Sequence, residues 1–485
     1  MPDQPYVLAI DQGTSSTKAV AVAEDGTVLA TAQVPLGQTH PAPGQVEQDA
    51  SEILASVHRA AEIVQQEIGS RVLTTGLSVQ RESALLWDPG ARKPLSPVLG
   101  WQDRRTSGAA TRLRGNAAGQ RVQELSGMPV DPMFSALKVR WLLDEHGSAD
   151  GVAAGTLDAF LVSALCGGRT HEAGSASRTQ LLDVTTGEWS EELLDIFGVP
   201  RAVLGEVADS DAPLGAITEG PLAGCRVDAV LGDSHAAMFG HGVRAPGEVK
   251  VTYGTGSSVL GLVPDGAAAP EGLVRTIAWA RGGRPVAAVE GNILSTGATL
   301  VWLARLLATT PEDLLALAET APADHGVDLV PAFAGLAAPW WDAEAVGLVS
   351  GLDQGVDRAV LARAAAESVA LQVGDVLDAV ERGGADVAAI HADGGPTRNA
   401  WLMQLQADLA GRRVRRSGVA ELSALGAAHL AGLAAGVWTE DDLVEMPRQI
   451  TEFNPHPSAA GGDRRDRWHA AVRRSRFRPN QENDS

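Results

Sequence analysis

The sequence predicts an α/β protein made of two similar domains. With 485 residues the chain is too long for one hydrophobic core, which indicates two large domains. Short apolar runs typical of buried strands alternate with longer runs of helical period. A strand, a hydroxyl-rich turn with glycine and a second strand occur near residue 7 and again near residue 249. The repetition predicts a duplicated architecture, with domains of residues 1–244 and 245–485.

The first of these hairpins opens the chain. Residues 7–10 form a short apolar run, typical of a buried strand, which stops at a carboxylate, Asp11. A glycine then allows a tight turn, and Thr14, Ser15 and Lys18 add hydroxyl, N–H and ammonium groups that can hold a phosphate. A carboxylate at this strand end can hold a magnesium ion through water. A hairpin whose polar turn has no function is the alternative.

A helix and a second strand come next. The pattern predicts a helix over 51–67, capped by Asp49, and a strand over 72–79. Arg81 and Glu82 follow that strand directly. Because ligands of α/β proteins bind at strand ends, these charged residues are candidates for a site, and a structural ion pair is the alternative.

An indole ring with charged neighbours follows a short strand over 97–100. Trp101 stands beside hydrogen-bond donors and acceptors, a combination that suits a polyhydroxylated ligand, because the ring covers a C–H face. We expect a polar loop near the site over 175–179.

A second carboxylate follows a strand over 227–231. This strand ends at Gly232, and Asp233 and Ser234 come directly after it. The alternative is that Asp233 only caps the following helix.

The second half repeats the opening pattern. Strands over 249–253 and 259–262 enclose a turn of glycine and hydroxyl residues, so we expect a nucleotide phosphate chain to be gripped from both sides. A helix over 294–307 is expected to offer free N–H groups to an anion at its N-terminus. The turn after a strand over 387–391 is a third glycine-rich candidate for nucleotide contact.

Further helices are expected over 135–145, 157–165, 189–197, 358–380, 399–410 and 423–433. From about residue 455 the arginine-rich end is expected to form a frayed surface helix and a loose tail without chemistry.

The bulk composition limits the partners. The chain has 60 acidic and 39 basic residues and a formal net charge of −21, which argues against nucleic acids and anionic membranes. Only Cys166 and Cys225 are present, which fits a reducing compartment. We find neither the basic start of a signal peptide nor a run of about 18 apolar residues, and therefore expect a cytoplasmic protein.

Several short motifs occur in an order that resembles the FGGY family of carbohydrate kinases, and within it glycerol kinase most closely. The resembling stretches lie at residues 10–14, 80–82, 101–106, 175–179, 232–233, 253–256, 339–342, 347–352 and 393–395. The resemblance implies two ribonuclease-H-like domains, as in actin, with the active site in the cleft between them. It also implies transfer of the ATP γ-phosphoryl group to a primary hydroxyl of a sugar or polyol.

The resemblance implies a role for each candidate residue. Asp233 is implied as the general base, and Asp11 and Asp233 as neighbours of Mg²⁺. The implied acceptor-binding residues are Arg81, Glu82, Trp101, Met133, Asp233 and Ser234. The implied ATP-binding residues are Thr14, Ser15, Lys18, Thr255, Gly297, Gly395 and Asn399. Family members often form dimers or tetramers, so a homodimer is one expected assembly.

Departures from glycerol kinase bear on the acceptor. Ser234 stands where glycerol kinase has glutamine after the base, and Met133 and Ser258 stand where two aromatic rings pack on glycerol. Room beside Ser258 leads us to expect an open-chain ketose or polyol of more than three carbons, with glycerol as the alternative. An ATP-gated, actin-like binding protein without sugar chemistry is the alternative from another class.

Overall fold

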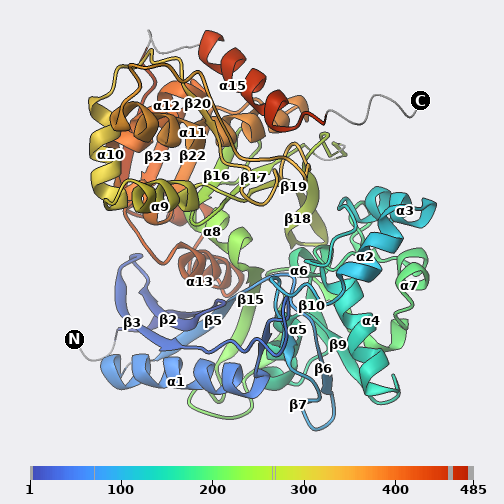
Figure 1. Cartoon of the computed structure of the whole chain (residues 1–485). Coiled ribbons are helices and arrows are strands. Elements are labelled where there is room, and N and C mark those ends of the chain that lie inside the picture. The colour runs from blue at the N-terminus through green and yellow to red at the C-terminus, as the bar shows by residue number, and fades with distance from the viewer. Residues whose placement is uncertain (1–3, 70, 265, 268, 457–461, 479–485) are drawn as a thin grey trace. The chain divides into compact units, whose positions relative to one another are not determined.

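The computed structural model describes residues 4–69, 71–264, 266–267, 269–456 and 462–478 (Figure 1). Its contacts divide the chain into two compact units. The first contains the residues up to 243 together with 275–288 and 421–447, and the second contains 244–274, 289–420 and the residues from 448 onward. The domain division at 244/245 stays a prediction. None of the helices in the described residues is long and apolar enough to cross a membrane.

The first unit is built on a six-stranded sheet. In spatial order its strands are β14 (Gly215–Ala216), β15 (Arg226–Gly232), β5 (Val72–Val79), β1 (Tyr6–Gln12), β2 (Ser16–Ala23) and β3 (Val28–Pro35). β1 pairs antiparallel with β2 and parallel with β5, and β5 pairs parallel with β15. The predicted opening hairpin and the strand over 72–79 are confirmed.

The predicted helix over 51–67 is confirmed as α1 (Ala50–Ile68), which packs its apolar stripe against this sheet. Asp49 caps it by accepting hydrogen bonds from the N–H groups of Ser51 and Glu52. α13 (Leu422–Ala434), from late in the chain, contacts β1, β5 and β15 as well as α8 (Asp233–His241). The approach to α8 needs a glycine, because a Cβ on Gly426 would lie 1.8 Å from the carbonyl oxygen of Ala236.

Smaller elements complete the first unit around a second apolar cluster. The remaining helices are α2 (Ser107–Arg114), α3 (Ala117–Ser126), α4 (Ser135–His146), α5 (Leu157–Cys166), α6 (Ala173–Ser177), α7 (Glu191–Phe197), a 3₁₀ turn (Arg201–Val203) and α14 (Glu440–Glu445). The short strands pair as β4 (Glu47–Gln48) with β8 (Val98–Leu99), β6 (Leu85–Asp88) with β7 (Lys93–Pro94) and β9 (Ala153–Gly155), β10 (Thr170–Glu172) with β13 (Glu206–Ala208), and β11 (Leu182–Asp183) with β12 (Glu188–Trp189).

The polar loop expected over 175–179 is wrong. Most of this segment belongs to α6, and all of it is buried. The carboxylate of Glu172 accepts hydrogen bonds from the N–H groups of Gly174 and Ser175. A side-chain cap from the preceding strand therefore allows a short helix where small polar residues alone indicate a loop.

The second unit contains a sheet of the same kind. The seven-stranded sheet has the order β18 (Val274–Arg281), β19 (Arg284–Ile293), β17 (Ser257–Leu262), β16 (Glu248–Tyr253), β22 (Ala389–Asp393), β23 (Arg413–Ser417) and β24 (Ile450–Phe453), and residues 275–288 of its first hairpin group with the first unit. A separate ladder joins β20 (Asp328–Val330) to β21 (Leu348–Ser350). The second hairpin is confirmed, since β16 pairs antiparallel with β17 and parallel with β22.

The helices of the second unit are α9 (Gly297–Leu306), α10 (Pro311–Thr320), α11 (Arg358–Arg382), a 3₁₀ turn (Gly395–Arg398), α12 (Ala400–Ala410) and α15 (Gly462–Ser475). α11 is buried over most of its length, because α9, α10 and α12 all contact it.

The expectation that the C-terminal helix is frayed and lies on the surface is wrong for the described residues. Trp468 of α15 is buried and donates a hydrogen bond of 2.8 Å to Asp375 of α11. Arg464 is also buried and forms ion pairs with Asp328 and Glu367. One arginine of a segment that suggests solvation therefore pairs with buried carboxylates. Residues 457–461 and 479–485, which belong to the predicted tail, lie outside the described residues.

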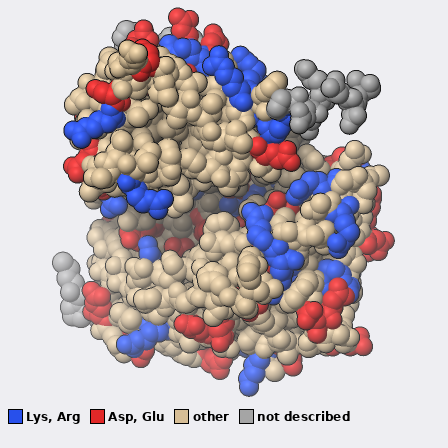
Figure 2. Space-filling view, viewed as in Figure 1, with Lys and Arg blue, Asp and Glu red and all other residues tan. Residues whose placement is uncertain are grey.

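Charged side chains of both signs are interspersed over the face shown in Figure 2.

Candidate active site

Two of the predicted carboxylates lie at the same edge of the first sheet. β5 lies between β1 and β15, and all three strands are parallel. Asp11 of β1 is in register with Ser78 of β5, and Ser78 is in register with Leu231, two residues before Asp233. The two residues are thus separated by two strand spacings, about 10 Å across the sheet, and by a further offset of two residues along the strand direction, and both lie at the carboxyl ends of the strands.

The environment of Asp11 favours its protonated form. Burial raises the pKa of Asp11 to about 6, and the charges of Asp233 and Glu421 act in the same direction. A hydrogen bond of 2.7 Å from the Ser78 hydroxyl and the charge of Lys18 oppose this shift without cancelling it. A divalent cation near Asp11 and Asp233 would relieve both the desolvation and the mutual repulsion of the carboxylates.

Among the described residues, no group of three or more His, Cys, Asp or Glu side chains could hold a metal ion by itself. Magnesium commonly binds through one or two carboxylates, waters and substrate phosphates, so the pair Asp11 and Asp233 fits this ion.

Asp233 is the first residue of α8, and its side chain is 39% exposed. One carboxylate oxygen lies 3.3 Å from Arg81 Nε and accepts a hydrogen bond of 2.7 Å from the N–H of Ser234. The backbone carbonyl of Asp233 accepts a hydrogen bond from the hydroxyl of Ser423 in α13. These contacts hold the carboxylate in one orientation while leaving it accessible.

The predicted acceptor residues Arg81 and Glu82 are buried behind Asp233. Arg81 Nη1 lies 3.4 Å from His235 Nε2, and its Nε lies 3.9 Å from Glu82. Arg178, also buried, donates a hydrogen bond of 2.5 Å to the Glu82 carboxylate. A charged chain from Arg178 through Glu82 to Arg81 therefore leads to Asp233.

The phosphate turn of the first unit contacts Trp101. The indole Nε1 of Trp101 donates a hydrogen bond of 3.2 Å to Thr14 Oγ1, and 40% of the residue is exposed. Two buried glutamines lie behind Thr14. Gln48 donates to the Thr14 carbonyl at 3.0 Å, and Gln80 donates to Gln48 at 2.9 Å. The structure thus brings the predicted phosphate and acceptor residues of this unit together.

The other predicted residues of the first unit are less directly connected. Lys18 is in register with Asp11 across the hairpin, and its ammonium lies 4.0 Å from Glu421. Ser15 is exposed. Met133 is half-buried just before α4, where its N–H donates to Asp131.

The predicted nucleotide residues of the second unit line one cavity of about 720 Å³. Thr255, Gly297, Gly395 and Asn399 all contribute to its wall. The wall also contains the apolar side chains of Leu300, Val301, Trp302, Pro311, Leu315 and Pro396 and the charged side chains of Arg305, Glu312 and Arg398. A cavity of this size with apolar walls and a few polar groups is typical of a site for a nucleotide-sized ligand.

The expectation of free N–H groups at the N-terminus of α9 is wrong. The N–H of Gly297 donates to the Gly254 carbonyl at 3.0 Å, and the N–H groups of Thr296 and Ala298 donate to the Thr255 carbonyl at 3.1 and 2.9 Å. These donors fasten α9 to the turn between β16 and β17. Position 297 needs glycine for this approach, because a Cβ there would lie 2.4 Å from the Gly254 oxygen.

Sequence reasoning missed three buried residues that support the site: Gln48, Lys138 and Arg178. Gln48 lies in the short strand β4 and Lys138 in α4, outside any of the motifs, whereas Arg178 lies in the motif at 175–179 but has no predicted role. Burial of a charged residue is uncommon unless it is paired, but a single sequence does not reveal which lysine or arginine is buried.

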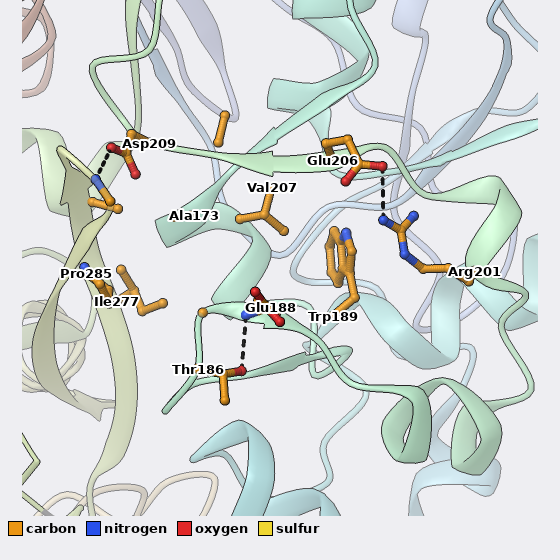
Figure 3. Close-up of a pocket in the computed structure, with 14 residues that line it drawn as sticks. Ala173, Thr186, Glu188, Trp189, Arg201, Glu206, Val207, Asp209, Ile277 and Pro285 are labelled. Atoms are coloured by element: carbon orange, nitrogen blue, oxygen red, sulfur yellow. Dashed lines mark hydrogen bonds and ion pairs between the residues drawn. The ribbon is translucent and has the colours of Figure 1, made fainter.

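A second cavity, of about 440 Å³, lies in the first unit around Trp189 and β13 (Figure 3). None of the predicted site residues lines it. Three of its charged side chains have local partners, since Arg201 contacts Glu206 at 3.1 Å and Asp209 accepts a hydrogen bond from the N–H of Gly283.

Comparisons with known proteins identify the family of the chain. Residues 6–240 match the N-terminal domain model of the FGGY family of carbohydrate kinases, and residues 249–435 match the C-terminal domain model. The chain is 40% identical to an apulose kinase of Pectobacterium atrosepticum, over 98% of this chain and 99% of that protein. It is 41% identical to a glycerol kinase of Aromatoleum aromaticum, over 97% and 99%.

Solved structures confirm the α/β fold with two ribonuclease-H-like, actin-like domains. A Plasmodium falciparum glycerol kinase with ADP matches with a TM-score of 0.93 and 26% identity, covering 99% of each chain. A xylulose kinase of Rhodospirillum rubrum matches with a TM-score of 0.88 and 25% identity, covering 97% of this chain and 98% of that one. The chain belongs to the FGGY family of carbohydrate kinases and is an ATP-dependent sugar or polyol kinase, not a binding protein without sugar chemistry.

Proposed function

We propose that this kinase phosphorylates a primary hydroxyl of a small open-chain ketose or polyol with more than three carbons. The observation that carries the proposal is the polar group at position 258. Where the resemblance to glycerol kinase leads us to expect an aromatic ring, Ser258 donates a hydrogen bond of 2.9 Å to the buried carboxylate of Glu290. A serine leaves room for more carbons, and a hydroxyl beside a carboxylate suits further hydroxyl groups.

The names of the similar proteins suggest two different candidates for the acceptor of this chain. The apulose kinase supports a sugar larger than glycerol, whereas the glycerol kinases of similar identity support glycerol as the second candidate. Met133, at the other position where a ring is expected, adds a flexible apolar side chain that adapts to an irregular ligand.

In the proposed reaction, the acceptor oxygen forms a bond to the γ-phosphorus of ATP, and the bond from that phosphorus to the oxygen bridging to the β-phosphate breaks. ADP leaves, and the hydroxyl proton passes to Asp233. The accessible carboxylate and its fixed orientation beside Arg81 support this role. Phosphoryl transfer depends mainly on positioning and charge stabilisation, so one oriented carboxylate is sufficient as the base.

The other residues are assigned by their contacts. Arg81, Glu82 and Trp101 would bind the acceptor, with Met133 and Ser234 at its margin. Thr14, Ser15 and Lys18 would contact the transferring phosphoryl group. Thr255, Gly297, Gly395 and Asn399, which share one cavity, would hold the nucleotide.

We assign Asp11 and Asp233 to a magnesium site. A magnesium ion held there supplies positive charge that offsets the charge of the transferring phosphoryl group. Asp11 contributes only as a carboxylate, so its protonation would weaken this site.

The test is a steady-state comparison of acceptors. Glycerol, erythritol, erythrulose, xylulose, ribulose, apulose and the corresponding polyols would be compared at saturating MgATP by ADP release and by identification of the phosphorylated product. We expect the highest kcat/KM for an acceptor with four or more carbons. A glycerol value above all others by a wide margin would contradict the proposal and support the second candidate.

A further inference from the structure

Lys138, the fourth residue of α4, is fully buried and uses all of its hydrogen-bond donors. Its ammonium donates to three backbone carbonyls, those of Glu82 at 2.7 Å, Gly100 at 2.8 Å and Met133 at 2.6 Å. An ammonium has three N–H donors and no acceptor, so this set is complete.

The three carbonyls belong to separate segments, and each segment carries part of the proposed acceptor site. Glu82 follows Arg81 after β5, Gly100 directly precedes Trp101, and Met133 itself stands at a predicted wall of the pocket. A single side chain therefore connects the three places from which the acceptor residues extend.

The hydrogen bond from Lys138 to the Glu82 carbonyl also helps to hold the backbone of Glu82 in an unusual conformation. Glu82 has φ of 54°, in the left-handed region that costs energy for a residue with a side chain. In this conformation its carboxylate meets Arg178 while its carbonyl meets Lys138. The ammonium thus helps to hold a strained residue in the arrangement that links Arg178 to Arg81.

We propose that Lys138 is a positioning residue, which fixes the shape of the acceptor pocket by holding these three segments at set distances. The inference rests on the proposed function, since it takes Arg81, Glu82, Trp101 and Met133 as acceptor residues. Lys138 does not touch the acceptor, because its ammonium is enclosed by backbone carbonyls.

The charge of Lys138 gives this role a pH dependence. Burial lowers the pKa of Lys138 to about 7, and the nearby charge of Arg104 acts in the same direction, while Glu82, Asp103 and Asp131 oppose it. A neutral amine has only two donors, and its lone pair repels a third carbonyl. Deprotonation above about pH 7 therefore releases one segment, so the acceptor KM is expected to rise.

Folding stability is expected to rise with pH over the range in which acceptor binding is expected to weaken. Because the pKa in the folded protein lies below the ordinary value of 10.5, the folded state binds fewer protons between these two values. The contribution of Lys138 to stability therefore rises with pH over this window. A weaker acceptor affinity in this range cannot then be attributed to unfolding through this residue.

The first experiment uses Lys138→Ala and the acceptor that the wild-type enzyme uses best. We expect the acceptor KM to rise roughly tenfold or more, as for loss of a charge-assisted contact, while the KM for ATP stays within about twofold. Added n-propylammonium, which replaces the missing atoms, should restore the acceptor KM, whereas tetramethylammonium, without donors, should not. Lys250→Met, which changes a buried lysine of the second unit, serves as the matched control and should leave the acceptor KM unchanged.

An equal change in both KM values, or no change in either, would overturn the proposal. If Lys138→Ala does not fold, Lys138→Met, which keeps the length of the side chain but has no donors, replaces it, and an unchanged acceptor KM would again overturn the proposal. A wild-type acceptor KM that stays flat between about pH 6 and 9 would contradict the pH dependence. Failure of the proposed function is recognised separately, in wild-type protein that phosphorylates none of the acceptors.

Discussion

The hairpins β1–β2 and β16–β17 open the sheets of the two units with the same strand pairing. They differ in which strand carries the carboxylate at the carboxyl end of the sheet. In the first unit, Asp11 on the hairpin strand is in register with Ser78 on the neighbouring parallel strand. In the second unit, Thr252 on the hairpin strand is in register with Asp393 on the parallel strand. The carboxylate and the hydroxyl residue have thus exchanged strands between the two units.

The two turns also differ in what supports them. The carbonyl of Thr14 accepts a hydrogen bond from the side chain of Gln48, whereas the carbonyl of Thr255 accepts two from backbone N–H groups at the start of α9. The Thr14 carbonyl of the first turn is therefore held by a side chain, and the Thr255 carbonyl of the second turn by backbone N–H groups of a helix that lines the cavity. On the proposed assignments, the first unit would supply the charged groups of the reaction and the second unit would supply the cavity for the nucleotide.

Replacing the proposed base is the most severe way to test this division. Asp233→Asn keeps the shape of the side chain but removes the proton acceptor, so we expect kcat to fall by about 10²–10⁴-fold. ATP should bind with nearly unchanged affinity, because the cavity that we propose for the nucleotide belongs to the second unit. Single-turnover kinetics and calorimetric titration with a non-hydrolysable ATP analogue measure the two effects.

Near-normal turnover of Asp233→Asn would remove this residue from the mechanism. Loss of ATP binding together with turnover would contradict the division of labour between the two units.

A methyl group at the nucleotide turn tests the other half of the comparison. Gly297→Ala places a Cβ 2.4 Å from the Gly254 carbonyl oxygen, so α9 has to move away from the turn. We expect the KM for ATP to rise by roughly tenfold, on the order of 1.4 kcal/mol, with a smaller effect on the acceptor KM. Initial-rate measurements with each substrate varied in turn separate these constants.

The matched variant in the first hairpin is Gly13→Ala. Its added Cβ would meet only the Ser16 oxygen, at 3.5 Å, which is an ordinary contact. The KM for ATP of this variant should change less than the KM for ATP of Gly297→Ala. A larger change in Gly13→Ala would show that the two turns are not supported in the different ways described.

Sequence reasoning predicted most of the fold, because strands such as β5 and helices such as α1 and α11 carry clear periodicity and caps. It also located both hairpin turns, and four of the residues that it assigned to ATP line one cavity, although their role stays a prediction. It did not predict α6 or the packing of α15. Both depend on contacts from distant segments, such as Glu367 with Arg464 for α15 and Thr276 with Ser177 for α6, which local composition does not encode.

The same limit applies to the site. Asp11, Asp233 and Trp101 stand in motifs at strand ends, so their residue types and their positions along the chain are enough to indicate chemistry. Gln48 and Lys138 act through hydrogen bonds to backbone carbonyls, and such bonds leave no motif at either partner.

The smallest expected effect, a shift in melting temperature, concerns Asp11, the carboxylate near the end of the first hairpin strand. Because the pKa of Asp11 is raised to about 6, the folded protein binds an extra proton between the ordinary value of 3.8 and about pH 6. Its contribution to stability therefore falls as pH rises through this window, while magnesium binding should rise over the same window. We expect Asp11→Asn to melt a few degrees higher than wild type at pH 8 without Mg²⁺, to melt similarly near pH 4, and to lose most activity at both values. Thermal melts at these two pH values, with and without Mg²⁺, measure the difference. A lower melting temperature for Asp11→Asn at pH 8 would show that the ionised carboxylate stabilises the fold, and the contrast between the two hairpins would then lose its electrostatic basis.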